Sequence, residues 1–230
     1  MKPLEVYEVL KGIGATELYH ANTVVTSCTF LEQGGLLSRA YVEERGLKQT
    51  AQSSDAKDKR YGIWDRVFVD HVDIHHRGGR IKGPNQYGPV LFILGINMLL
   101  DLPAKSEVLV TKANPVHWTD RQLDKDRWYL TAAELAENIK YGNFDKMLVI
   151  KTLEGKVDFP DEQIRIALDD PQRKMLSGTD AYAHAKRRLK AAAEAGRAKV
   201  LIDKHVCRDD CTCLDKYKTY DASYFDSRFL

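Results

Sequence analysis

Apolar residues recur at two different spacings along the chain, and these spacings predict where helices and strands lie. Residues 4–11 alternate apolar and charged side chains at helical spacing and end at a glycine, which predicts a first helix. The segment LYHANTVV (18–25) is rich in β-branched residues and predicts a strand, and CTFLEQGG (28–35) predicts a short helix that ends at glycine. Residues 45–60 contain almost no apolar side chains, so we expect a mobile loop there.

Further along the chain the apolar runs are of strand length. DRVFVDHVDI (65–74) and SEVLVTKANP (106–115) predict strands, and PVLFILGINMLL (89–100) predicts a buried apolar segment. DKMLVIKT (145–152) and QIRIALDD (163–170) predict two strands joined by a turn at Glu154-Gly155.

Two further helices are predicted from their capping residues. Thr131 and Glu134 have capping-box spacing, which predicts a helix through about residue 140. Thr179 or Asp180 can cap a final helix that ends at Gly196, and KVLID (199–203) predicts a last strand. Strands outnumber helices without regular βαβ alternation or internal repeat. The pattern therefore favours a single α+β domain over residues 1–230.

Composition limits the class of protein. Hydrophobic residues make up 43% and charged residues 30% of the chain, which is ordinary for a globular protein. No apolar run has the length of a membrane helix, and Glu5 and Glu8 interrupt the N-terminal segment, so it is not a signal peptide. We therefore expect a cytoplasmic protein with no membrane partner.

The net charge of +2 is small, but the basic residues are clustered. Such clusters can contact phosphates, or they can be solvated faces of helices and loops. One cluster lies early in the chain and one late; their members are Lys57, Lys59, Arg60 and Arg66, and Arg187, Arg188, Lys190, Arg197 and Lys199.

Two groups of residues have side chains that bind metals. HVCRDDCTC contains His205, Cys207, Cys211 and Cys213, which could hold zinc, but the spacing is tighter than in common zinc motifs, so we expect reduced thiols. His71, Asp73 and His75 would share one face of a strand, where a polar outer surface is the simpler interpretation. No metal is therefore assigned. The chain also lacks a Walker A motif, a G-x-G-x-x-G fingerprint and a G-x-S-x-G nucleophile motif.

Five short segments occur in a particular order. They are Tyr19-His20-Ala21-Asn22, Gly35-Leu36-Leu37-Ser38, Arg60 just before Tyr61-Gly-Ile-Trp64, Phe68-Val69-Asp70-His71, and Gly88-Pro89-Val90-Leu91-Phe92. In order and spacing, over about residues 18–170, the chain resembles the DarT-type ADP-ribosyltransferases, toxins that use NAD to modify nucleic-acid bases. The resemblance implies an ADP-ribosyltransferase-like split β-sheet core with flanking helices, followed by a basic helix and a cysteine-containing tail (179–230).

The resemblance also implies roles for particular residues, with NAD as co-substrate. His20 would hydrogen-bond the nicotinamide ribose, Gly34-Gly35 would let the cofactor approach closely, and Tyr41 or Tyr87 would stack on the nicotinamide. The implied cofactor-binding residues are Tyr19, His20, Asn22, Gly35, Ser38, Tyr41 and Tyr87. Arg60 would clamp the pyrophosphate or position the acceptor.

The chain departs from the family at the catalytic carboxylate. The family has a glutamate at the start of the strand MLVIK, and this position is Lys146. Asp145, just before it, and Glu154, at the far end of the strand, are therefore the candidate catalytic carboxylates.

The activity that the resemblance implies is transfer of ADP-ribose to a base of single-stranded DNA or RNA, because base edges inside a duplex are out of reach. Lys59, Arg187, Arg188 and Lys190 would hold phosphates. A role as a toxin in phage defence or a toxin–antitoxin pair, with a neutralising antitoxin protein, follows from the family. The alternatives are a protein-directed transferase, a nucleic-acid- or partner-binding module with an altered catalytic site, and a metal enzyme built on His71, Asp73 and His75.

Overall fold

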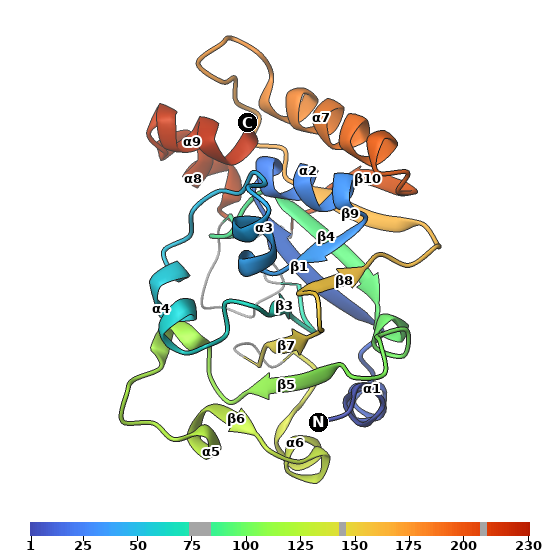
Figure 1. Cartoon of the computed structure of the whole chain (residues 1–230). Helices are drawn as coiled ribbons and strands as arrows, with labels where there is room; N and C mark the ends of the chain where they lie inside the picture. The colour runs from blue at the N-terminus through green and yellow to red at the C-terminus, as the bar shows by residue number, and fades with distance from the viewer. Residues whose placement is uncertain (74–83, 143–145, 208–210) are drawn as a thin grey trace.

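The chain is described from a computed structural model that covers residues 1–73, 84–142, 146–207 and 211–230. Within these ranges the strands form three sheets (Figure 1). The first sheet has the order β1 (Glu17–Asn22), β4 (Val90–Gly95), β9 (Ile164–Leu168), β10 (Val200–Lys204). The second has the order β3 (Val67–Val69), β7 (Leu148–Lys151), β5 (Glu107–Thr111), β6 (Trp128–Tyr129). The third pairs β2 (Gly35–Leu37) with β8 (Lys156–Asp158).

The two larger sheets meet at an isolated bridge between Tyr19 of β1 and Asp70, which follows β3. The Tyr19 amide donates to the Asp70 carbonyl at 2.7 Å, and the Asp70 amide donates to the Tyr19 carbonyl at 2.8 Å. Pairing is antiparallel throughout these sheets except between β9 and β10, which are parallel. The bridge brings the end of β3 beside β1, and the candidate site lies at this junction.

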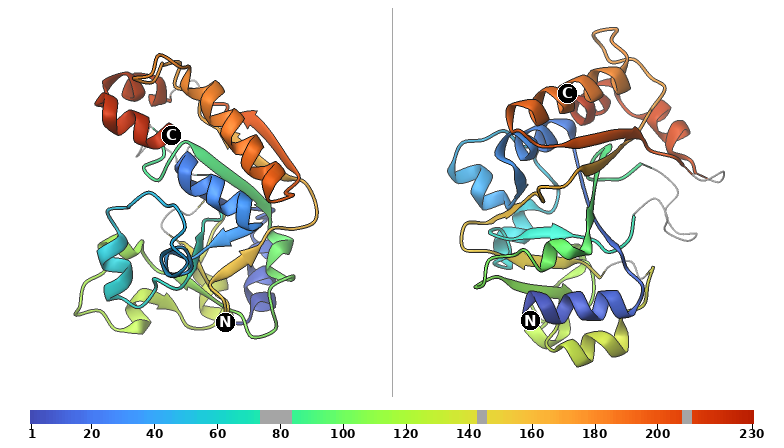
Figure 2. Two further views of the ribbon diagram at one scale, coloured as in Figure 1. Left: turned by 45° about the horizontal axis from the view of Figure 1, so that its top comes forward. Right: turned by 90° about the vertical axis from the view of Figure 1, so that its right-hand side faces the viewer.

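Helices cover the sheets on several sides. They are α1 (Pro3–Gly12), α2 (Val24–Gln33), α3 (Arg39–Glu44), α4 (Asp55–Arg60), α5 (Asp124–Arg127), α6 (Ala132–Asn138), α7 (Ala181–Ala195), α8 (Cys213–Thr219) and α9 (Ala222–Phe229), with the 3₁₀ turns η2 (Ile96–Leu99) and η3 (Pro115–His117). The long helix α7 packs on α2 beside the first sheet, while α1 and α6 lie at the opposite end of the molecule (Figure 2).

The predicted caps at Thr131 and Asp180 are confirmed. The Thr131 hydroxyl accepts from the Glu134 amide at 3.1 Å, and the Asp180 carboxylate accepts from the Ala183 amide at 2.8 Å. Each satisfies an amide that has no partner inside its helix. The main core lies between α2, α7 and the first sheet, where Phe30, Leu31 and Phe92 are fully buried.

Three predicted elements are wrong in extent or pairing. Helix α2 begins at Val24, before the predicted start at Cys28, because packing against α7 overrides the strand preference of its β-branched residues. Residues 55–60, predicted as loop, form α4, which buries Asp58. Strands β7 and β9 are not a hairpin: β8 lies between them in sequence, and they belong to different sheets.

The mixed helix and strand class predicted from the sequence is confirmed. The two C-terminal helices, α8 and α9, were not predicted. Their apolar residues, including Tyr217, Phe225 and Phe229, are buried against the main core. No helix in the described ranges has both the length and the apolar character needed to cross a bilayer.

Candidate functional site

A pocket opens where β1, the end of β3, α4 and η3 come together. The space between its lining side chains is about 720 Å³ when the open solvent at its mouth is included. Its apolar walls come from α2, β2, β3 and the start of β7, with side chains of Phe30, Leu37, Phe68 and Met147. Its polar side chains come from β1, α3, α4 and the loops after β3 and β5. The junction of the two sheets therefore forms a mainly apolar cavity that is also lined by several polar side chains.

His20 on β1 is held in one orientation in this pocket. Its Nδ1 lies 2.7 Å from the Phe68 carbonyl, so Nδ1 carries the proton and donates it. Its Nε2 lies 3.4 Å from the Asn22 amide nitrogen, which is a donor, so Nε2 is the acceptor. Burial lowers the pKa of His20 to about 4, even though the Phe68 hydrogen bond opposes this shift. His20 is therefore neutral at physiological pH, with its lone pair on the Asn22 side.

Two carboxylates, Asp58 and Asp70, line the same pocket. Asp58 on α4 is 8% exposed, and burial raises its pKa to about 6, with a smaller contribution from Asp55. A hydrogen bond from Ser54 and the charge of Arg39 partly oppose this shift. The main chain of Asp70 forms the bridge to Tyr19, so the backbone position of this residue is set by the junction of the sheets.

Tyr87 completes the polar part of the cavity. Burial raises the pKa of its hydroxyl, and the charges of Asp70 and Asp58 raise it further, while a hydrogen bond with Asn114 lowers it. The hydroxyl is therefore protonated at neutral pH and available as a hydrogen-bond donor. Because the charges of Asp58 and Asp70 both raise the pKa of Tyr87, the two carboxylates lie close enough to influence its ionisation.

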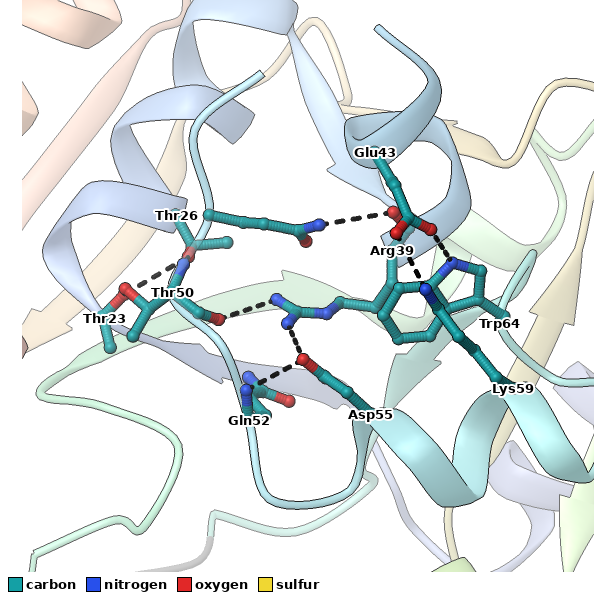
Figure 3. A network of polar contacts seen from close by, with 10 residues as sticks. Thr23, Thr26, Arg39, Glu43, Thr50, Gln52, Asp55, Lys59 and Trp64 are labelled. Carbon is teal, nitrogen blue, oxygen red and sulfur yellow. Dashed lines mark hydrogen bonds and ion pairs between the residues drawn. The ribbon is translucent and has the colours of Figure 1, made fainter. Parts of the chain in front are cut away.

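Arg39 links separate segments of the pocket wall through hydrogen bonds (Figure 3). One guanidinium nitrogen donates to the Thr50 carbonyl at 2.9 Å, and another pairs with Asp55 at 2.6 Å. The same Asp55 oxygen accepts from the Gln52 amide at 3.0 Å. These contacts attach the segment before α4 to the start of α3. The polar segment that looked like loop in the sequence is thus held by Arg39, together with hydrogen bonds that involve Thr26 and Thr29 of α2.

Arg66 also lines the pocket, and its side chain is 16% exposed. Its Nε and Nη1 atoms are buried and have no hydrogen-bond partner within the described residues. The carboxylate of Asp65 lies 3.8 Å from Nε, which is too long for a hydrogen bond. Buried guanidinium donors without acceptors are costly unless a ligand supplies the acceptor. Arg66 therefore marks a place where an anion would be favourable.

The outer rim next to α4 holds Glu43, Lys59 and Trp64 (Figure 3). The Glu43 carboxylate accepts from Lys59 at 2.7 Å and from the Trp64 indole at 2.8 Å, and these hydrogen bonds lower the pKa of Glu43. The Lys59 ammonium also lies 4.4 Å from the Trp64 ring. Lys59, predicted to contact phosphate, is thus in an ion pair at the rim.

The structure brings three of the predicted cofactor residues into the pocket, namely His20, Asn22 and Tyr87, and places four elsewhere. Tyr19 donates its hydroxyl to Glu17 at 2.8 Å. Ser38 caps α3 by accepting from the Tyr41 amide at 3.1 Å, and the Tyr41 ring lies under Arg45, 3.7 Å from its guanidinium carbon.

Gly35, the fourth, lies in β2 opposite Asp158 of β8. A Cβ at this position would lie 2.5 Å from the Val157 carbonyl oxygen. Glycine at position 35 therefore permits a close approach between β2 and β8. The adjacent Gly34 has a left-handed φ of 69° and ends α2, which is the usual role of glycine at a helix C-terminus.

The predicted catalytic residues do not line the pocket in the part of the chain that the structure describes. Arg60 is exposed and pairs with Asp120. Glu154 is exposed in the bend between β7 and β8, and Asp145 lies outside the described residues. Lys146, at the family's glutamate position, donates to the Lys112 carbonyl at 2.5 Å.

Sequence reasoning missed Asp58, Asp70, Arg39 and Arg66 as site residues. A signal for Asp58 was present in DAKDKR (55–60), where acidic residues precede basic ones as in a short helix that complements its own dipole. Asp70 was inside a quoted motif, but alternation along a strand could not show that it faces a cavity.

The late basic residues lie on α7. Arg187 and Lys190 border a shallow surface groove together with Tyr182 and Lys186. Arg188 does not border this groove, and its charge acts on Cys28 of α2. None of these residues lines the pocket at the junction of the sheets.

No protein-family model matches the chain, and no curated protein matches it. Among solved structures, the chain is similar to "Thermus sp. 2.9 DarT in complex with ADP-ribosylated ssDNA", with 15% sequence identity and a TM-score of 0.45. The alignment covers 83% of this chain and 95% of that chain. A TM-score of this size does not establish a shared fold.

Proposed function

We propose that the chain is an NAD-dependent ADP-ribosyltransferase that transfers ADP-ribose to a base of single-stranded nucleic acid. The observation that carries the proposal is the pocket at the Tyr19–Asp70 bridge. It gathers neutral His20 and Asn22, which come from the first motif of the DarT resemblance, and Tyr87, which directly precedes the Gly88–Phe92 motif, around two carboxylates and Arg66. Such a cavity combines the apolar walls and the few convergent polar groups that a nucleotide cofactor requires.

The reaction breaks the bond between C1′ of the nicotinamide ribose and the nicotinamide nitrogen. Nicotinamide leaves with the bonding electron pair, and positive charge develops on the ribose. A nitrogen of the acceptor base then supplies an electron pair to C1′ and loses a proton. An ionised carboxylate beside the ribose stabilises the developing charge. We assign this role to the pair Asp58 and Asp70, in place of the glutamate that is absent at Lys146.

The other pocket residues have the chemistry to bind the rest of NAD. The acceptor Nε2 of His20 and the amide of Asn22 suit the ribose hydroxyls. The unsatisfied donors of Arg66 suit the pyrophosphate. The aromatic rings of Phe30, Phe68 and Tyr87 provide apolar surface for the nicotinamide.

The acceptor strand would approach from the rim, where the ammonium of Lys59 lies beside Trp64, an arrangement that suits a phosphate next to a stacked base. Arg187 and Lys190 on α7 would extend the contact to phosphates further along the strand. A role as a toxin, with a neutralising protein partner, belongs to the same proposal and rests on the family resemblance.

The test is incubation of the purified protein with NAD labelled in its adenylate part, together with separate pools of single-stranded DNA, RNA and protein. We expect label in one nucleic-acid pool, and loss of it in His20→Ala and in at least one of Asp58→Asn and Asp70→Asn. Glu137→Gln, an exposed carboxylate on α6, is the matched control and should transfer normally. Transfer that survives all three pocket substitutions would place the reaction elsewhere.

A non-catalytic binding module is the second candidate, favoured by the lysine at the expected glutamate position. The lysine is held in place by its hydrogen bond to Lys112 and lies 5.3 Å from the Tyr129 ring. This candidate predicts no transfer to any pool and weak or absent NAD binding. Label in the protein pool alone would instead indicate a protein-directed transferase.

A further inference from the structure

Three cysteines near the C-terminus form a cluster outside the pocket. The Sγ atoms of Cys207, Cys211 and Cys213 all lie within 4.8 Å of one another. The Sγ atoms of Cys211 and Cys213 are 2.9 Å apart, and Cys207 Sγ lies 3.9 Å from Nδ1 of His205. The tight spacing of HVCRDDCTC favoured separate reduced thiols, but in three dimensions the side chains converge on one point.

His205 is oriented as a metal-binding histidine would be. It is 9% exposed, and its backbone amide donates to the Leu168 carbonyl at 2.8 Å, which fixes it at the end of β10. Its Nε2 lies 3.2 Å from a carboxylate oxygen of Asp73. A carboxylate on one ring nitrogen selects the tautomer in which the other nitrogen has the lone pair. The Asp169 carboxylate lies 3.8 Å from Nδ1, which is too long for a hydrogen bond, so Nδ1, the nitrogen on the Cys207 side, is the one suited to bind a cation.

We propose that Cys207, Cys211, Cys213 and His205 Nδ1 form a structural zinc site, with Asp73 as the positioning residue behind the histidine. Three thiolates and one imidazole are a common ligand set for tetrahedral structural zinc. Zn–S bonds of about 2.3 Å at tetrahedral angles place two thiolates about 3.8 Å apart. A thiolate and an imidazole nitrogen on the same ion would be about 3.6 Å apart, so Cys207 Sγ and His205 Nδ1, which are 3.9 Å apart, would move about 0.3 Å closer on binding zinc, while Cys211 and Cys213 would move apart by about 1 Å.

The site would join the C-terminal helices to the edge of the first sheet. Cys213 is the first residue of α8, and His205 follows β10. The Tyr217 hydroxyl of α8 donates to Asp169, just after β9, at 2.5 Å. Zinc would therefore add a second attachment of α8 to the sheet beside this hydrogen bond.

This attachment reaches the pocket through α9. Arg228 of α9 donates to the carbonyls of Asn85, at 3.1 Å, and Gln86. The side chain of Asn85 accepts from the backbone amide of Tyr87 at 2.9 Å. The C-terminal helices thus support the segment that carries Tyr87 into the pocket. Zinc would stabilise that segment without being part of the reaction.

The first experiment is to express the full chain in medium supplemented with ZnCl₂, purify it under reducing conditions and measure bound metal by plasma mass spectrometry. We expect about one zinc per chain, as in closed structural sites. Cys213→Ser should lose it, and Asp73→Asn should weaken zinc binding by about 10- to 100-fold. Cys28→Ala removes the buried cysteine of α2, far from the cluster in sequence, and should retain zinc.

Cobalt substitution keeps the proposal testable if Cys213→Ser fails to fold. Wild-type protein titrated with CoCl₂ should show the thiolate-to-cobalt charge-transfer band together with the intense visible bands of tetrahedral cobalt. His205→Gln should shift those visible bands, because one nitrogen ligand is lost. Absence of zinc and of the cobalt bands in the wild type would overturn the proposal, as would a mass lower by two hydrogens that maps to a Cys211–Cys213 disulfide. Metal content is independent of ADP-ribose transfer, so the two proposals fail separately.

Discussion

Asp58 and His20 line the same pocket, and burial moves their pKa values in opposite senses, to about 6 for Asp58 and to about 4 for His20. In both cases the cavity disfavours the charged form. The histidine is therefore neutral over the whole physiological range, while the aspartate becomes charged only near pH 6. Between pH 5 and 7 the ionised fraction of Asp58 therefore changes strongly, while His20 stays neutral.

If Asp58 is the catalytic carboxylate, transfer of ADP-ribose should rise with pH as a single ionisation with a midpoint near 6. His20 should not contribute a second inflection, because its pKa of about 4 lies below that range. The measurement is the pH dependence of kcat/KM for NAD between pH 5 and 8. A profile that is flat over this range would exclude Asp58 as the catalytic carboxylate.

The raised pKa of Asp58 also predicts an effect on stability. The folded state binds the proton more tightly than the unfolded state, so stability is lost as pH rises from the unfolded value of 3.8 to about 6, and remains lost above that. A shift of about two pKa units corresponds to about 3 kcal/mol. Asp58→Asn should therefore raise the free energy of unfolding by about 1–3 kcal/mol at pH 8 and by less at pH 5.

Urea unfolding of Asp58→Asn at the two pH values measures this difference. Glu137→Gln, with its exposed carboxylate, should show no such change. Equal stabilisation at both pH values would mean that charge burial is not the cause.

Substitution of Arg66 and of Arg60 tests which arginine binds NAD. Arg66 lines the pocket, whereas Arg60 is the arginine predicted from the sequence. Arg66→Gln should raise the KM for NAD about tenfold or more, because the pocket loses donors that have no other hydrogen-bond partner in the described residues. Arg60→Gln should leave KM unchanged, because Arg60 is exposed and paired with Asp120. The measurement is the KM for NAD of both variants by steady-state kinetics. A raised KM in Arg60→Gln with an unchanged KM in Arg66→Gln would identify Arg60 as the arginine that binds the cofactor.

Replacement of His20 separates its structural role from its role in the reaction. His20→Ala should reduce transfer about 100-fold, the size expected for loss of a hydrogen bond directed at the reacting sugar. It also leaves the Phe68 carbonyl without its donor, which should lower the free energy of unfolding by about 1–3 kcal/mol. Thermal unfolding and activity should be measured together, and Leu31→Ala, which opens a cavity in the same core at a residue that does not line the pocket, is the packing control. Comparable losses of activity in both variants would reduce His20 to a packing role.

Gly35 is expected to matter for folding and not for NAD binding. A Cβ at Gly35 meets the Val157 carbonyl at 2.5 Å, so Gly35→Ala should force β2 away from β8 and lower stability by about 1–3 kcal/mol. The KM for NAD of the folded fraction should be unchanged. Isothermal titration with NAD at a temperature where the variant is folded checks this, and a large loss of affinity would return Gly35 to the cofactor site.

The sequence correctly predicted those elements that depend only on residues close together in the chain. The caps at Thr131 and Asp180 depend on residues three positions apart, and both form as expected. The segments around Val67 and Val108 each contain several apolar residues within a few positions, which predicted strands. Both strands are found in the second sheet. The tight turn geometry at Gly34 follows from the freedom of glycine at positive φ.

The site was only partly predictable, for a physical reason. His20 and Asn22 were identified through a motif, and Tyr87 as one of two aromatic residues that could stack on the nicotinamide, but no motif shows which residues far apart in the chain share a cavity. Asp58 was assigned to a loop because its segment lacks apolar residues, and the contact of Arg39 with Asp55 that orders it is 16 positions long.

By itself the sequence determined the mixed helix and strand class, the capped helices and the apolar strands, because each depends on residues that are close together in the chain. Only the tertiary structure decided that β7 and β9 belong to different sheets, that Asp58 and Arg66 share the pocket with His20, and that three cysteines converge beside His205. These relationships arise from contacts between distant segments, whose partners are chosen by packing of the whole core and not by local preference.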